Sequence, residues 1–158
     1  MRKSKSSILL MEMIICIFFF ALCAVISSQV FVQAHLLSEK TISVNHATIV
    51  LGNLSESFYA GNGDITSIAN DFPGYAVTDS THVTIYMDKN YNYIPVSSIA
   101  VENYAFYAQL TVSPNASNGT IDADASFYSI KSDIDNNPVN ETIYTIKLIT
   151  NDPITINQ

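Results

Sequence analysis

The sequence predicts an α+β fold, in which a long N-terminal helix with a transmembrane first half packs on a small antiparallel β-sheet. Three observations support this prediction. No glycine or proline occurs from Ile8 to Leu51, so nothing there interrupts a helix. Apolar residues then recur at the spacing of one helix face as far as Phe58. After Tyr75 the chain is rich in β-branched and aromatic residues that alternate with polar ones, which is typical of strands.

The N-terminal segment predicts a membrane anchor. Residues 1–7 form a leader in which every charge is positive, and residues 8–29 are the predicted transmembrane half of the helix. The run from Ile8 to Ile26 carries a single charge, Glu12, and its 19 residues would span about 28 Å, close to the thickness of a bilayer core. Because positive charge precedes the span, we expect a single-pass cell-membrane protein with a cytoplasmic N-terminus and an extracytoplasmic C-terminal domain.

Residues 30–60 are the predicted extracytoplasmic half of the same helix. Its apolar residues advance mostly by three or four positions and so share one face: Leu37, Val44, Ala47, Leu51, Leu54 and Phe58. We expect this stripe to lie against the sheet. The segment from Ala60 to Gly63 is predicted to end the helix, because its glycines and asparagine tolerate the backbone conformation of a helix C-terminus.

Residues 61–158 predict the antiparallel sheet domain. Asp64 is placed to cap a short helical turn. Strands are expected over residues 82–87, 104–112, 121–128 and 144–149, with a short return strand over 93–96. The connecting loops are expected over residues 88–92, 113–119 and 132–139, which are rich in Asn, Asp, Ser and Pro. Alternation along the strands predicts one buried and one solvated face of the sheet.

Four tyrosines are candidates for a contact surface. Tyr91, Tyr93, Tyr107 and Tyr128 are predicted on or near the solvated face of the sheet. Exposed tyrosine is typical of surfaces that bind partners. An equally simple interpretation is that these rings only cover the far side of a thin sheet.

Composition and motifs argue against catalysis and nucleic-acid binding. The net charge is −7, and from Thr41 onward twelve acidic residues face three basic ones, so the domain repels nucleic acid. The three histidines lack zinc-site spacing and the serines lack a nucleophile-elbow pattern, so we expect no enzyme, catalytic residue or cofactor. Asp133, Asp135 and Asn137 are spaced like the start of a calcium loop. Pro138 replaces the glycine that such a loop requires, which favours a polar hairpin turn and no metal.

The N-terminus resembles that of type IV pilins and pseudopilins, through its short basic leader, the apolar run with an early glutamate and the long helix. In that family a prepilin peptidase cuts before an apolar residue, and the fifth residue of the mature chain is glutamate. Setting Glu12 at that place puts the cut between Ser7 and Ile8. Ser7 stands where the family has glycine, and Ile8 where it often has phenylalanine. The resemblance implies that Glu12 neutralises the N-terminal amine of a neighbouring subunit, a pairing that is favourable in hydrocarbon.

The resemblance implies a function in assembly. The stretch from Asn45 to Tyr59 is similar to pilin-like proteins of Gram-positive bacteria. We therefore expect a structural subunit or minor component of a type IV pilus-like, secretion or DNA-uptake pseudopilus. Its implied partners are other pilin-like subunits, the membrane and a prepilin peptidase, with no nucleic acid.

Two alternatives remain open. One is a single-pass, membrane-anchored binding or accessory protein of the cell surface that does not polymerise. The other is a secreted domain cleaved after Ala34. The first residue of the mature chain distinguishes the three: Ile8, with or without N-methylation, for the pilin-like subunit, Met1 for the anchored protein and His35 for the secreted domain.

Overall fold

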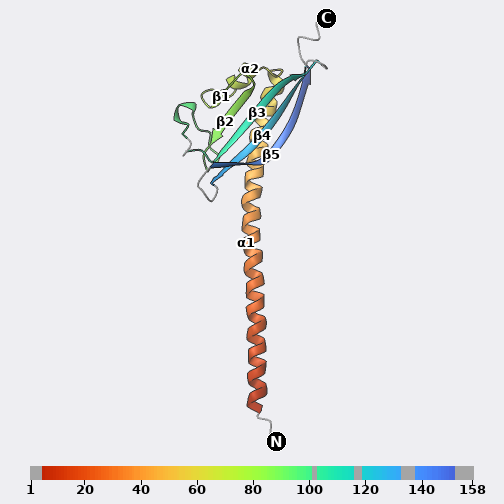
Figure 1. The fold of residues 1–158 in the computed structure, drawn as a ribbon, viewed down its shortest axis with the longest axis vertical. Coiled ribbons are helices and arrows are strands. Elements are labelled where there is room, and N and C mark those ends of the chain that lie inside the picture. Colours follow the sequence, from red (N-terminus) through yellow and green to blue (C-terminus); the bar gives the residue numbers. More distant parts are fainter. Residues whose placement is uncertain (1–4, 101–102, 116–118, 133–137, 152–158) are drawn as a thin grey trace. The chain divides into compact units, whose positions relative to one another are not determined.

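The predicted α+β fold is confirmed in a computed structural model, which describes residues 5–100, 103–115, 119–132 and 138–151. The helices are α1 (Lys5–Ala60), α2 (Ile65–Asn70) and a 3₁₀ turn (Val96–Ser98). The strands are β1 (Ala76–Thr78), β2 (His82–Met87), β3 (Phe106–Asn115), β4 (Thr120–Ser132) and β5 (Pro138–Asn151). All neighbouring strands pair antiparallel, and their order in the sheet follows the sequence, β1-β2-β3-β4-β5 (Figure 1).

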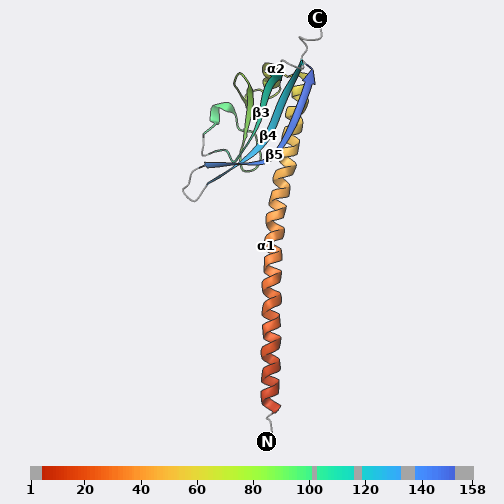
Figure 2. The ribbon, with the colours of Figure 1, turned by 45° about the vertical axis from the view of Figure 1, so that its right-hand side comes forward.

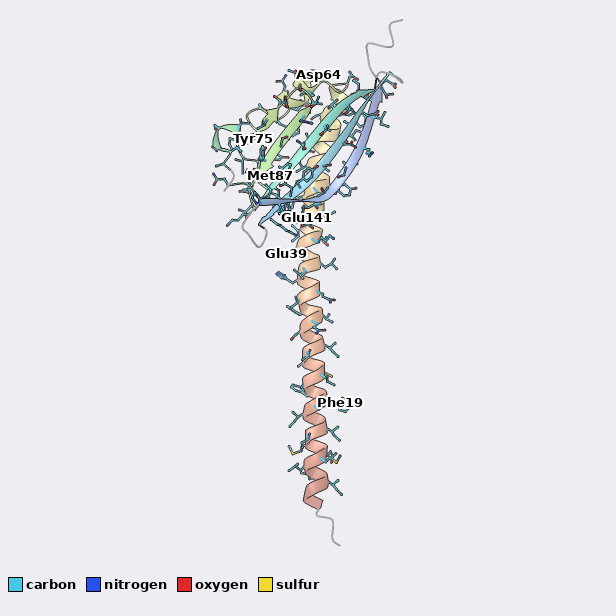
Figure 3. All side chains as sticks on the ribbon, in the orientation of Figure 1. Phe19, Glu39, Asp64, Tyr75, Met87 and Glu141 are labelled. Carbon is cyan, nitrogen blue, oxygen red and sulfur yellow. The ribbon has the colours of Figure 1, made fainter. Side chains whose placement is uncertain are left out.

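The chain forms two compact units, Met1–Ile42 and Ser43–Gln158. In the first unit, the described side chains from Ile8 to Ile42 are all exposed. Figure 3 shows these side chains, Phe19 among them, projecting from different sides of the helix. Burial therefore does not hold this part of α1 in place within the described chain. The second unit contains the end of α1, the short helix α2 and the whole sheet.

The core of the second unit lies between the end of α1 and the inner face of the sheet (Figures 1 and 2). The helix contributes Ala47, Val50, Leu51, Leu54 and Phe58, all buried. The strands contribute Val83, Ile85, Met87, Ala108, Leu110, Val112, Ala123, Ala125, Phe127 and Leu148, also buried. The predicted helix stripe is therefore confirmed from Ala47 to Phe58. The prediction that the stripe begins at Leu37 is wrong, because the Leu37 side chain is 66 % exposed and belongs to the first unit.

The end of α1 is set by a Schellman motif. The Gly63 amide donates to the Phe58 carbonyl at 2.9 Å, and the Asn62 amide donates to Tyr59. Asn62 and Gly63 both have positive φ, 49° and 78°, which stops helix propagation. A Cβ at Gly63 would lie 2.9 Å from a methyl carbon of Ile121, so a larger residue here would displace the Ile121 side chain and also strain the backbone at its positive φ.

The helix α2 begins as predicted. The Asp64 carboxylate accepts hydrogen bonds from the backbone amide of Ser67 at 2.9 Å and from its hydroxyl at 2.7 Å. This is an N-cap, and it satisfies an amide that the helix itself leaves free. The same two hydrogen bonds lower the pKa of Asp64 from its ordinary value of 3.8. Asp64 lies at the α2 end of the sheet domain (Figure 3).

Several strand predictions differ from the structure. β3 begins at Phe106 and not at residue 104. β4 continues to Ser132 and β5 already begins at Pro138, so both extend into the loop that was expected over residues 132–139. The loop expected over residues 113–119 is shorter, because β3 continues to Asn115, with Pro114 opposite Ile121. The return strand expected over residues 93–96 is wrong: Tyr93 makes one isolated bridge to Met87, and Pro95 leads into the 3₁₀ turn. A proline cannot donate to a ladder, which limits the pairing here. The short edge strand β1 was not expected as a separate strand.

Candidate functional site

The first candidate site is the exposed apolar part of α1. Within the described residues, one helix, counted from Ile8 to Ala60, is long and apolar enough to cross a membrane. None of its most apolar window is buried inside the protein, which distinguishes it from a core helix. A secretory signal sequence near the N-terminus meets the same criteria of length and composition, so this observation weakly indicates a membrane anchor and leaves the processing open.

Glu12 is the single acidic residue of the apolar run from Ile8 to Ile26. On a helix its side-chain neighbours are three and four positions away: Ile8, Leu9, Ile15 and Cys16. None of these can neutralise a carboxylate, and within the part of the chain that the structure describes no side chain pairs with Glu12. A carboxylate in hydrocarbon is costly and requires a cationic or hydrogen-bonding partner. Such a partner for Glu12 would come from outside the described chain.

The other residues predicted from the resemblance lie near the start of α1. Ser7 and Ile8 are both helical, two to three residues after the first residue of α1, and Ile8 is exposed. The calcium-loop candidates Asp133, Asp135 and Asn137 lie outside the described residues. Among the residues that are described, no group of three or more His, Cys, Asp or Glu side chains could hold a metal ion.

The second candidate site is the outer face of the sheet, which carries a row of tyrosines. Tyr86, Tyr107 and Tyr128 lie directly opposite one another on β2, β3 and β4. The rings of Tyr107 and Tyr128 are stacked with centroids 4.6 Å apart, and the Tyr86 ring lies 6.0 Å from Tyr107. Tyr104, just before β3, packs edge-on against Tyr86 at 4.7 Å. The row therefore forms a continuous aromatic ridge across three strands.

The packing of the ridge raises the pKa of two of its tyrosine hydroxyls. Burial raises the pKa of the Tyr107 hydroxyl, and the neighbouring hydroxyls of Tyr128, Tyr86 and Tyr104 raise it further. Burial, followed by the nearby Tyr104, raises the pKa of Tyr86 in the same way. These hydroxyls stay protonated at neutral pH, so the ridge can donate and accept hydrogen bonds without carrying charge.

Beside the ridge, the outer face is polar and shallowly hollowed. A depression of about 370 Å³ is lined by Gln109, Thr111, Asp124, Ser126, Tyr128, Thr145 and Lys147. The hydroxyls of Ser126 and Thr145 hydrogen-bond each other at 2.9 Å. The Lys147 ammonium lies 4.0 Å from the Asp124 carboxylate, an exposed pair that contributes little to stability. The face is therefore suited to polar contacts.

The tyrosine prediction is half right. Tyr107 and Tyr128 lie on the outer face as expected. Tyr91 and Tyr93 were predicted there wrongly: both pack against the core cluster on the inner side. The backbone of the 88–92 turn directs Tyr91 inward, and Tyr93 packs with Phe72, edge-on at 6.5 Å.

Tyr86 and Tyr104 were missed as members of the ridge. The alternation of the strand from His82 to Met87 could have found Tyr86. That alternation puts Tyr86 on the same face as Thr84 and His82, opposite the buried Val83 and Ile85.

The chain matches no known protein family, and neither a curated protein nor a solved structure is significantly similar to it.

Proposed function

We propose that this chain is a structural subunit, major or minor, of a type IV pilus-like or pseudopilus-like assembly. The observation that carries the proposal is Glu12, an acidic residue without a described partner in an exposed apolar helix. The α+β arrangement is consistent with the proposal, because the end of α1 completes the core of the sheet domain. The apolar beginning of α1 is then the part that a membrane or an assembly would cover.

The chemistry of Glu12 supports assembly through charge pairing. A processed chain would begin at Ile8 and carry a free α-amine about one helical turn from Glu12. An isolated carboxylate and an isolated amine are each costly in hydrocarbon. If the amine of one copy pairs with the carboxylate of the next, the free-energy cost of placing each charge in hydrocarbon falls. Removing one partner leaves the other charge unpaired. This pairing would select for correctly staggered copies.

The orientation follows from the flanking charge. The positive leader favours a cytoplasmic N-terminus, and the sheet domain would then lie outside the cytoplasm. The excess of acidic residues in that domain would disfavour contact with anionic lipid head groups and nucleic acid. The partners we propose are therefore further pilin-like subunits, the membrane and a prepilin peptidase acting between Ser7 and Ile8.

The decisive experiment determines the mature N-terminus and tests Glu12 together. Mass spectrometry of the purified chain should show a first residue of Ile8. In cells, Glu12→Gln should leave the membrane level unchanged, because it removes a cost of insertion, while recovery in sheared filaments or cross-linked complexes falls. Glu39→Gln is the matched control, since Glu39 is an exposed acid on the same helix and lies 3.5 Å from His35. If Glu12→Gln assembles as well as the parent and Glu39→Gln, the proposal is wrong.

A second candidate function is a membrane-anchored surface protein that binds a partner and does not polymerise. The half-buried tyrosine ridge formed by Tyr86, Tyr104, Tyr107 and Tyr128 favours it, because tyrosine is enriched at binding interfaces. In this case the mature chain begins at Met1 and Glu12→Gln has no effect on complexes. If Tyr128→Ser abolishes binding of the partner while Glu12→Gln leaves the complex intact, the second candidate is favoured over the first.

A further inference from the structure

One side chain joins the sheet domain to the first turn of α1 in the second unit. The ring of Tyr91 is inserted between two other rings, stacked on the His46 imidazole at 4.0 Å and on the Phe106 ring at 4.5 Å. Its hydroxyl lies 2.8 Å from the Ser43 hydroxyl, within hydrogen-bond distance. Ser43 is also the first residue of the second compact unit. The ring therefore contacts α1 where that unit begins.

The backbone of Tyr91 is strained in order to place this ring. Its φ is 64°, in the left-handed region that bulky residues rarely adopt. The turn holds this conformation through Asp88, whose carboxylate accepts hydrogen bonds from the amides of Asn90 and Asn92 at 2.8 and 2.9 Å. The Tyr91 amide also donates to the Asp88 carbonyl at 3.0 Å. Strain of this kind persists only where surrounding contacts hold it.

Core burial is weaker in the helix turn that Tyr91 contacts than in the turns that follow it. From Val50 to Phe58 the helix is fixed by fully or almost fully buried apolar side chains. Before Ala47 the helix side chains of this unit are half-buried or exposed. Contacts of Ser43 and His46 with Tyr91 thus replace core burial at this end of the unit. Two ring stacks and a hydrogen bond favour the inserted state, while the backbone strain opposes it.

We propose that Tyr91 is a latch that holds the Ser43–His46 turn of α1 on the sheet domain. With the ring inserted, the rigid part of the domain begins at Ser43. When the ring withdraws, the Tyr91 backbone relaxes and the turn is released, so that the rigid part begins near Ala47. Because favourable and unfavourable terms are of similar size, the released state is a minor conformation of the native protein. This inference rests on the fold of the second unit alone and does not depend on the proposed function.

Amide hydrogen exchange of the full chain in lipid nanodiscs tests the latch. Tyr91→Ala should raise exchange over residues 43–47 by roughly tenfold or more and leave Val50–Phe58 protected. Tyr91→Phe keeps both ring stacks and loses only the hydrogen bond, so its exchange should rise less. Tyr75→Ala is the matched control, since Tyr75 contacts Tyr93 and, among the described residues, makes no ring contact with α1. Unchanged exchange over residues 43–47 in Tyr91→Ala would overturn the proposal.

Two further measurements keep the test decisive. Tyr91→Gly and Tyr91→Ala both remove the ring, but only glycine relieves the positive φ. The glycine variant should therefore have the higher Tm, and an equal or lower Tm would refute the strain. Carbethoxylation of His46 should quicken severalfold in Tyr91→Ala relative to His35, which serves as an exposed internal reference. An unchanged ratio of the two rates would show that Tyr91 does not cover His46.

Discussion

The packing of α1 on the sheet is tested most sharply at Leu54. Its side chain is fully buried among the helix stripe and the inner face of the sheet. Leu54→Ala removes three buried carbon atoms, about 2.4 kcal/mol in transfer free energy at about 0.8 kcal/mol each. The cavity left behind adds to this loss, so we expect the free energy of unfolding to fall by about 2–5 kcal/mol. In a domain of this size each kcal/mol lowers Tm by about 4 °C.

The assay is thermal and urea unfolding of a soluble fragment that starts at Ser38, which contains the whole second unit. Ile49→Ala provides the matched control, because Ile49 lies on the same helix but is 61 % exposed. Truncation of an exposed side chain changes stability by about 0.5 kcal/mol or less. The two variants should therefore differ by about 6 °C or more in Tm. Equal melting temperatures would refute the packing of α1 on the sheet.

Three further predictions concern orientation and pH. Protease added to intact protoplasts should degrade the sheet domain, and full protection would contradict an extracytoplasmic domain. Hydrogen bonds from the side chain and backbone of Asn92 lower the pKa of Asp88 below 3.8. The stabilisation by Asp88 is therefore present above pH 3.8 and lost as pH falls through the lowered pKa, so Asp88→Asn should flatten the acid fall in Tm. Burial raises the pKa of Tyr107 above 10, so its contribution is present below pH 10 and lost as pH rises through the raised pKa. Tyr107→Phe should make the alkaline fall in Tm shallower, and an unchanged slope would contradict the buried hydroxyl.

The sequence predicted the elements whose pattern is long and periodic. The stripe from Ala47 to Phe58 repeats at helix spacing, and the structure buries it. The strand expected over residues 82–87 coincides with β2. The N-cap at Asp64 was predictable because it depends only on a side chain three residues before the amide that it caps. Such features are local, so a single sequence contains the information that determines them.

Features that depend on long-range pairing were predicted poorly. The strand β1 has three residues, too few for a periodic pattern, and it exists because it pairs with β2. Pro114 indicated a loop, but its position opposite Ile121 keeps it within β3. Ile143 is an extra residue in β5, where Phe127 pairs with Tyr144 and Tyr128 pairs with Thr142. A bulge of this kind reverses the face of each following side chain, and alternation alone does not reveal it.

The candidate sites show the same contrast between features that are local in the sequence and features that depend on the fold. Glu12 was found from composition, because a charge within an apolar run is visible without any fold. Tyr107 and Tyr128 followed from strand alternation. Tyr91 was placed on the wrong face because its direction depends on a positive φ, which the sequence indicates reliably only at glycine or asparagine. The Tyr91 latch was therefore beyond sequence reasoning.

The two units differ in how their apolar side chains are covered, and this difference connects the fold to the proposed function. In the second unit the residues from Ala47 to Phe58 complete the core of the sheet, so its burial is satisfied within one chain. In the first unit the apolar side chains from Ile8 to Ile26 are all exposed, and Glu12 has no described partner. Exposed apolar surface of this extent requires a lipid or protein cover. Substitutions at Leu54 should therefore alter folding, whereas substitutions at Glu12 should alter assembly and leave the folded sheet domain unchanged.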